Sequence, residues 1–136
     1  IKCLFSDKKS AGEKKPYYYY RFDADIPGWD NAGTFHSVDL WFFFETLAKC
    51  WRPFVGRHYD LSRMMCNYWV NFIKTGDPNG NDADGKPMPY WYPYEKEKPC
   101  EMIFMSDRPV VNCGGVTPFK EFLQEQIKKT LSIGKI

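Results

Sequence analysis

The residue best suited to acid–base chemistry in this sequence is His36, within the stretch Gly33–Trp41. A serine hydroxyl is a weak nucleophile near neutral pH, so acyl transfer requires a base with a suitable pKa within hydrogen-bonding distance. Histidine, with an unperturbed pKa of about 6.5, can take that proton and pass it to the leaving alcohol when a carboxylate orients its ring. A histidine before a helix is also commonly a capping or surface residue, and spacing alone leaves both roles open.

His36 lies between an expected strand and an expected helix. Residues 17–22 are strand formers that do not alternate with polar residues, which predicts a strand covered on both faces, inside a sheet flanked by helices. The long irregular segment 23–33 follows and ends as the chain reaches His36. The next helix, residues 40–48, would be capped by Ser37. Groups in such a loop lie beyond the carboxyl end of a strand, where open α/β sheets bind their ligands.

The clearest predicted helix runs from Leu61 to Lys74. Its apolar residues recur at the i, i+3, i+4, i+7 spacing of one face, Asp60 would cap its start, and Gly76 would end it. Residues 101–106 are expected to form a short strand.

The ends of the chain have simpler expected roles. Residues 1–16 include a charged connector, and residues 117–131 predict a C-terminal helix that begins with Thr117 and Pro118. The chain starts at Ile1, with neither a Met nor a signal peptide, so its true beginning is expected to be missing.

Composition narrows the function classes. The 136 residues suffice for one domain with a core, since 43% are hydrophobic. The 19 Lys and Arg balance 17 Asp and Glu, which argues against nucleic-acid binding, and no apolar run is long enough to span a bilayer. The five cysteines include no Cys-x-x-Cys pair, so free thiols are expected, and their odd number slightly favours a cytoplasmic, reducing location.

Several segments in register carry a family resemblance between about Pro16 and Met105. They are Tyr-x-Tyr-x-Phe, Gly33-x-Phe35-His36-Ser37-x-Asp39-Leu40-Trp41-x-x-Phe44-x-Thr46-Leu47, Trp51-Arg52-Pro53, Leu61-Ser62-x-x-Met65-x-x-Tyr68-Trp69-x-Asn71-Phe72-x-Lys74-Thr75-Gly76-Asp77-Pro78-Asn79-Gly80, and Met88-Pro89-x-Trp91-x-x-Tyr94. This string resembles the C-terminal part of the type-B carboxylesterases, most closely the bacterial para-nitrobenzyl esterases. Matched segments in register are more specific than any single motif.

The resemblance implies an α/β chain, the C-terminal portion of an α/β-hydrolase fold with short strands, flanking helices and an incomplete sheet. It implies a parent that hydrolyses small carboxylic esters through a Ser-Glu/Asp-His triad, in which His36 is the triad histidine. No cofactor and no metal are expected. Asp39 matches a buried acidic position of cholinesterase-like members, although helix N-terminal charge stabilisation alone also accounts for it.

The residues Trp41, Phe42 and Phe44 could line the acyl or alcohol pocket, and core packing is their other explanation. Two positions depart from the family pattern: Glu45 stands where the family usually has Gly, and Thr34 where a small apolar residue is common. These departures leave open whether the backbone after the helix that follows His36 has the shape that is usual in the family.

The other catalytic parts are absent from the sequence. The nucleophile of an α/β hydrolase lies in Gly-x-Ser-x-Gly, and the nearest echo, Ser10-Ala11-Gly12, has Lys8 where the first Gly is required. The oxyanion-hole donors come from the same turn and from an early Gly-rich loop. The chain alone is therefore expected to be inactive, with the missing N-terminal part of the same polypeptide as its partner. Apolar faces made to pack on that part are expected to favour self-association.

Three other classes of protein share parts of this pattern. A non-catalytic cholinesterase-like binding or adhesion scaffold would keep the fold and lose the chemistry. A carbohydrate-binding module would use exposed aromatic rings, but such modules are usually all-β, and the periodic helices argue against one. A metal site on His36 and His58 lacks a third ligand at a recognisable spacing.

Overall fold

The computed structural model describes residues 2–4, 16–95 and 97–114, together with positions 122, 125, 126 and 129. Four strands form one sheet in the order β1-β2-β3-β4, with β1 Lys2–Leu4, β2 Tyr18–Phe22, β3 Glu101–Phe104 and β4 Pro109–Asn112. The β1/β2 and β3/β4 pairs are antiparallel, whereas β2 and β3 are parallel. The helix predicted for residues 117–131 and most of the connector lie outside the described residues.

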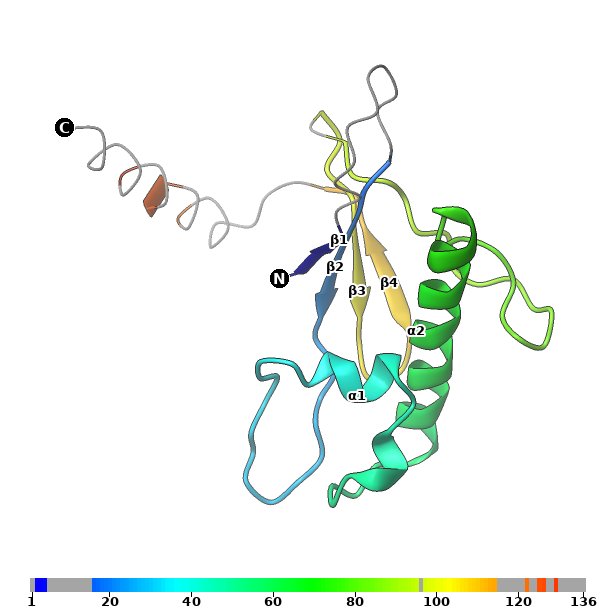
Figure 1. The fold of residues 1–136 in the computed structure, drawn as a ribbon. Coiled ribbons are helices and arrows are strands. Elements are labelled where there is room, and N and C mark those ends of the chain that lie inside the picture. The colour runs from blue at the N-terminus through cyan, green and yellow to red at the C-terminus, as the bar shows by residue number, and fades with distance from the viewer. Residues whose placement is uncertain are drawn as a thin grey trace.

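Two α-helices and a short 3-10 helix complete the described fold: α1 Asp39–Phe43, η1 Leu47–Lys49 and α2 Gly56–Thr75. In Figure 1, α2 runs alongside the strands, and α1 lies at the end of the sheet where β2 and β3 finish. The loop that carries His36 therefore lies beyond the carboxyl ends of two parallel strands, as expected.

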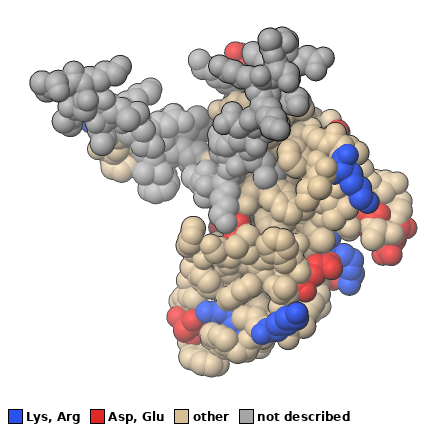
Figure 2. Space-filling view, viewed as in Figure 1, with Lys and Arg blue, Asp and Glu red and all other residues tan. Residues whose placement is uncertain are grey.

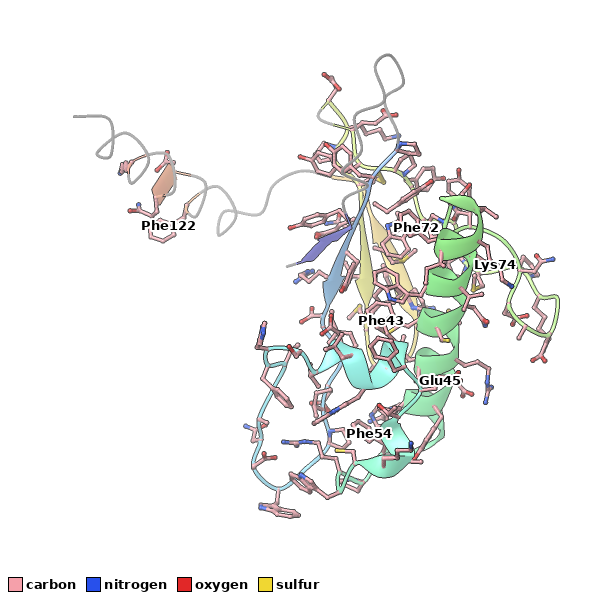
Figure 3. All side chains as sticks on the ribbon, viewed as in Figure 1. Phe43, Glu45, Phe54, Phe72, Lys74 and Phe122 are labelled. Carbon is pink, nitrogen blue, oxygen red and sulfur yellow. A yellow bond between two sulfur atoms is a disulfide. The ribbon has the colours of Figure 1, made fainter. Side chains whose placement is uncertain are left out.

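An aromatic core lies between the sheet and α2. Trp91 is fully buried and meets the rings of Tyr18, Tyr20 and Tyr68 at centroid distances of 5.5 to 6.0 Å. Its indole N–H donates to the carbonyl of Tyr19 over 3.1 Å. Figure 3 shows Phe43 and Phe72 on the sides of α1 and α2 that face the strands. One side of β2 is thus firmly packed against helices.

The two faces of β2 are not equally covered, contrary to the sequence-based expectation. Tyr18 and Tyr20 are buried, but Tyr19 and Arg21, which point to the other face, are half-buried. The absence of polar alternation was misleading because tyrosine has both an apolar ring and a hydroxyl that tolerates partial exposure.

The helix starts differ from the predicted ones. No side chain caps α1, and Ser37 has φ of 66°, so its carbonyl rather than its hydroxyl accepts the N–H of Leu40. Helix α2 begins at Gly56 instead of Leu61, and His58 takes the role expected of Asp60, because its Nδ1 accepts the N–H of Val55 over 2.9 Å. Burial lowers the pKa of His58.

The ends of α1 and α2 use the left-handed backbone conformation. Gly76 ends α2 with φ of 79°, as predicted. Glu45, which follows α1, has φ of 51°, a conformation that costs a residue with a side chain roughly 1–2 kcal/mol. Glu45 therefore adopts the left-handed backbone conformation that a glycine at this position would favour.

The expectation of free thiols is wrong for Cys100 and Cys113, which form a disulfide. The antiparallel register pairs Glu101 with Asn112, so the residues just outside this pair face each other, with their Cα atoms 4.2 Å apart. Cys50 and Cys66 are free thiols. Because disulfides persist in oxidising compartments, the argument for a reducing location no longer holds.

The described surface carries both signs of charge. On the face drawn in Figure 2, Lys and Arg lie among Asp and Glu, and most of the described surface there is formed by other residues. Within the described ranges, no helix is long and apolar enough to cross a membrane.

The three buried tyrosines predict alkaline instability. Burial raises the pKa of Tyr18 to about 12, with a further contribution from Asp77, and burial also raises the pKa of Tyr20 and of Tyr68. Above about pH 10 the unfolded chain loses tyrosine protons that the folded chain keeps, so stability falls as pH rises. Denaturant unfolding monitored by fluorescence from pH 8 to 11.5 should show this fall.

A matched pair of variants tests whether buried tyrosine hydroxyls cause the loss of stability at alkaline pH. Tyr68→Phe removes a buried hydroxyl and should make the decline above pH 10 shallower, whereas Tyr92→Phe, at a residue that is 47% exposed, should not change its slope. An unfolding free energy that stays flat to pH 11.5 would contradict the prediction.

Candidate active site

His36 occupies the turn that directly precedes α1, with its side chain exposed. It borders a hollow of about 350 Å³ that is lined by Tyr20 and Phe22 of β2 and by residues 34–39. One wall of the hollow is thus a strand of the sheet, and the other is the histidine turn and the start of α1. A substrate or a further part of a catalytic site could enter this space.

The start of the loop before His36 is tied to the end of β3 and to the residues that follow it. The N–H of Asp23 donates to the carbonyl of Phe104 over 2.9 Å, and that of Asp25 donates to Ser106 Oγ over 2.7 Å. The hydroxyl of Thr34 donates to the carbonyl of Ala24 over 3.2 Å and so closes the base of the loop. Thr34, the other departure from the family pattern, therefore contributes a bond that a small apolar residue cannot make.

Asp39, the first residue of α1, is only 4% exposed. The hydroxyl of Tyr20 donates to its carboxylate oxygen Oδ2 over 2.9 Å. The position is also favourable for the helix dipole, although α1 is a short helix. Asp39 thus does more than stabilise a helix end, because it links the element after His36 to the strand before it.

Sequence reasoning did not identify Tyr20 as the partner of Asp39. The two residues are 19 positions apart, and their pairing depends on how β2 lies against α1. The available signal was a tyrosine in a hydrophobic strand, because a buried tyrosine hydroxyl usually has a hydrogen-bond partner.

The three aromatic residues proposed as pocket lining have different environments. Phe42 is fully buried and packs against Phe22 and Phe54, with centroid distances of 4.9 and 5.7 Å. Trp41 borders a separate hollow with Cys50 and Trp51, and Phe44 is 65% exposed. The residues that line the hollow at His36 do not include these three, and their role in a substrate pocket stays a prediction.

His58 lies in the first turn of α2, 1% exposed, with its Nδ1 used as a cap. In residues 2–4, 16–95 and 97–114, no three His, Cys, Asp or Glu side chains are grouped as metal ligands would be. The sulfur, carboxylate and imidazole groups of the described chain thus offer no set of ligands around His36.

The family model described as Carboxylesterase family matches residues 4–115, most of the chain. The chain belongs to the carboxylesterase family. Carboxylesterase 4A of Bos taurus is 35% identical over 92 residues, which cover 61% of this chain and 15% of the bovine protein. The predicted family membership is therefore confirmed.

Solved esterases support the same assignment. An esterase from Clostridium hathewayi has a TM-score of 0.62 and 26% identity, and the match covers 82% of this chain and 21% of that one. A PNB esterase has a TM-score of 0.59 and 25% identity, with 80% and 21% coverage. The described structure is a partial α/β-hydrolase fold, as predicted, and the chain spans about a fifth of the length of these two solved esterases.

The bond between Tyr20 and Asp39 generates a prediction. Tyr20→Phe should lower the free energy of unfolding by about 1.5–3 kcal/mol, because a buried hydrogen bond to a carboxylate is lost and the carboxylate loses a donor. Urea unfolding measures the change.

Tyr68→Phe is the matched control, since that hydroxyl donates to the neutral carbonyl of Pro89 over 2.6 Å. It should cost about 0.5–1.5 kcal/mol. A Tyr20→Phe cost no larger than the Tyr68→Phe cost would show that the bond to Asp39 contributes no more than an ordinary one.

Proposed function

We propose that this chain is the segment of a longer serine carboxylesterase that supplies its general-base histidine, His36. The observation that carries the proposal is that His36 borders a hollow beyond the carboxyl ends of β2 and β3, in a chain of the carboxylesterase family. That edge of an open α/β sheet is where ligands bind. The proposed substrates are small carboxylic esters.

In the proposed reaction, an imidazole nitrogen of His36 takes the proton of a serine hydroxyl as the serine oxygen attacks the ester carbonyl. The resulting imidazolium then gives this proton to the leaving alcohol, which completes the acyl-enzyme. Water, deprotonated by the same histidine, releases the acid and frees the serine. An acidic residue hydrogen-bonded to the other ring nitrogen would fix the tautomer.

The serine and the oxyanion-hole donors must come from another part of the proposed parent. The described chain contributes the histidine and its supports, namely the bond from Tyr20 to Asp39 and the closure of the loop by Thr34. Because a base without a nucleophile gives almost no acyl transfer, the 136-residue chain is proposed to be inactive by itself.

The first test uses para-nitrophenyl acetate and the full-length protein, wild type beside His36→Ala. Loss of a triad histidine typically lowers kcat by about 10⁴ or more, so nearly all turnover should disappear. The 136-residue chain alone should not exceed the buffer rate.

The matched control is His58→Asn, which changes the other histidine of this chain at a buried position. Its kcat should stay within a few-fold of wild type at a temperature where thermal unfolding shows it folded. If His36→Ala retains turnover, His36 is not the base; if wild type is inactive as well, a binding scaffold becomes the better explanation.

In the proposed parent, part of the surface of this chain packs against the rest of the polypeptide. Large apolar side chains are exposed on the described chain, including Trp29 at 85%, Ile73 at 76% and Phe44 at 65%. Exposed apolar groups of this size favour association when the chain is isolated. Sedimentation equilibrium of the 136-residue chain should give a mass above 16.0 kDa that rises with concentration, and a concentration-independent monomer would contradict this.

A further inference from the structure

A buried cation supports the loop that leads to His36. Arg52, which follows η1, is only 8% exposed. Its guanidinium forms a two-point bond with the carboxylate of Asp30, with N···O distances of 3.0 and 2.7 Å. The same Nη1 donates to the carbonyl of Pro27 over 3.0 Å. One side chain from outside the loop thus binds the loop at two separate points.

The aromatic contacts of Arg52 extend this support to the histidine. The guanidinium carbon lies 4.6 Å from the ring centroid of Trp51 and 5.4 Å from that of Phe35. Phe35 directly precedes His36, and its ring meets Trp41 of α1 edge-on at 5.7 Å. Cation–π contacts of a desolvated guanidinium are among the stronger ones in proteins. Arg52 therefore contacts the loop at Pro27, at Asp30 and at Phe35, the residue before His36.

Gly28 leaves the room that this arrangement needs. A Cβ at position 28 would lie 2.6 Å from Nη1 of Arg52 and 2.6 Å from Oδ1 of Asp30. A flexible arginine could swing away from such a methyl group, but Arg52 is fixed by its bonds to Asp30 and Pro27. Any residue other than glycine at this position must therefore break or shift these contacts.

We propose that Arg52 is a positioning residue that holds the loop 23–35 in the shape that presents His36 to its reaction partners. The inference rests on the proposed function of His36 and adds the residue that fixes its location. Arg52 itself does not touch the substrate. A small shift of a catalytic group has a large effect on the rate, since a displacement of about 1 Å can lower kcat about a hundredfold.

Arginine is required at this position for geometric reasons. A lysine would keep the positive charge, but an ammonium cannot make the planar two-point bond with Asp30 or stack on the rings of Trp51 and Phe35. Hydrogen bonds from Arg52 hold the pKa of the Asp30 carboxyl below its usual range, so the pair is ionised at neutral pH.

Two variants disturb the contacts between Arg52 and the loop, one at the arginine and the other in the loop. Arg52→Lys changes the cation, and Gly28→Ala keeps the arginine in the sequence but puts a methyl group 2.6 Å from the position of its Nη1. Steady-state kinetics of the full-length protein with para-nitrophenyl acetate should show kcat lowered at least about tenfold in both, with KM within about threefold of wild type.

The matched control is Arg63→Lys. Arg63 is an exposed arginine of α2 that lies 3.7 Å from Asp60, so kcat and KM should both stay near wild type. Thermal unfolding of each variant shows whether the protein is folded at the assay temperature, which separates lost positioning from lost structure.

The combined results separate the positioning role of Arg52 from the proposed role of His36 as the base. Loss of turnover in His36→Ala with unchanged kcat in Arg52→Lys and Gly28→Ala would overturn the positioning role and leave the proposed base intact. Full turnover in His36→Ala would overturn both the proposed base and the positioning role of Arg52. A fall in kcat that only follows a loss of folded protein would also overturn the positioning role, because Arg52 would then be a structural residue without a specific effect on the reaction.

Discussion

The hydrogen bond from the hydroxyl of Tyr20 to the carboxylate of Asp39 is the interaction on which the arrangement around His36 depends. Tyr20 belongs to β2, before the loop, and Asp39 begins α1, after it. Burying a carboxylate costs free energy unless hydrogen-bond donors surround it. The buried position of Asp39 at the start of α1 is therefore favourable only where its carboxylate can accept the hydrogen bond of the Tyr20 hydroxyl. The bond thereby sets the distance between the strand and the helix that enclose the hollow.

The aromatic core gives Tyr20 a fixed position. Its ring meets those of Phe43, Trp69, Trp91 and Phe104 at centroid distances between 5.5 and 6.1 Å, in edge-to-face arrangements. Such pairs have a preferred geometry as well as buried area, so they restrict how the ring can tilt. The same packing that stabilises the sheet against α2 therefore aims the hydroxyl at Asp39. In this way the stability of the fold and the geometry of the candidate site have a common source.

Sequence patterns predicted the elements that depend on local periodicity and missed the contacts that depend on tertiary pairing. The 3.6-residue apolar spacing of α2 was recognisable, but its start was not, because His58 caps it in a way that no simple motif describes. The disulfide between Cys100 and Cys113 follows from the β3/β4 register. At the candidate site, His36 was proposed from its motif and its place after a strand, whereas the contacts of Tyr20 with Asp39 and of Arg52 with Asp30 depend on how distant segments pack and could not be predicted from spacing.

The most direct measurement is a crystal structure of the full-length protein in its free form, with the distance from His36 to the serine of the proposed nucleophile turn as the readout. A general base must lie within hydrogen-bonding reach of the proton that it removes, with heavy atoms about 2.6–3.2 Å apart or somewhat more in a free enzyme. The account predicts that a ring nitrogen of His36 lies at that distance from the serine oxygen, with Tyr20 still bonded to Asp39. A different histidine at the serine, with His36 facing solvent, would contradict it.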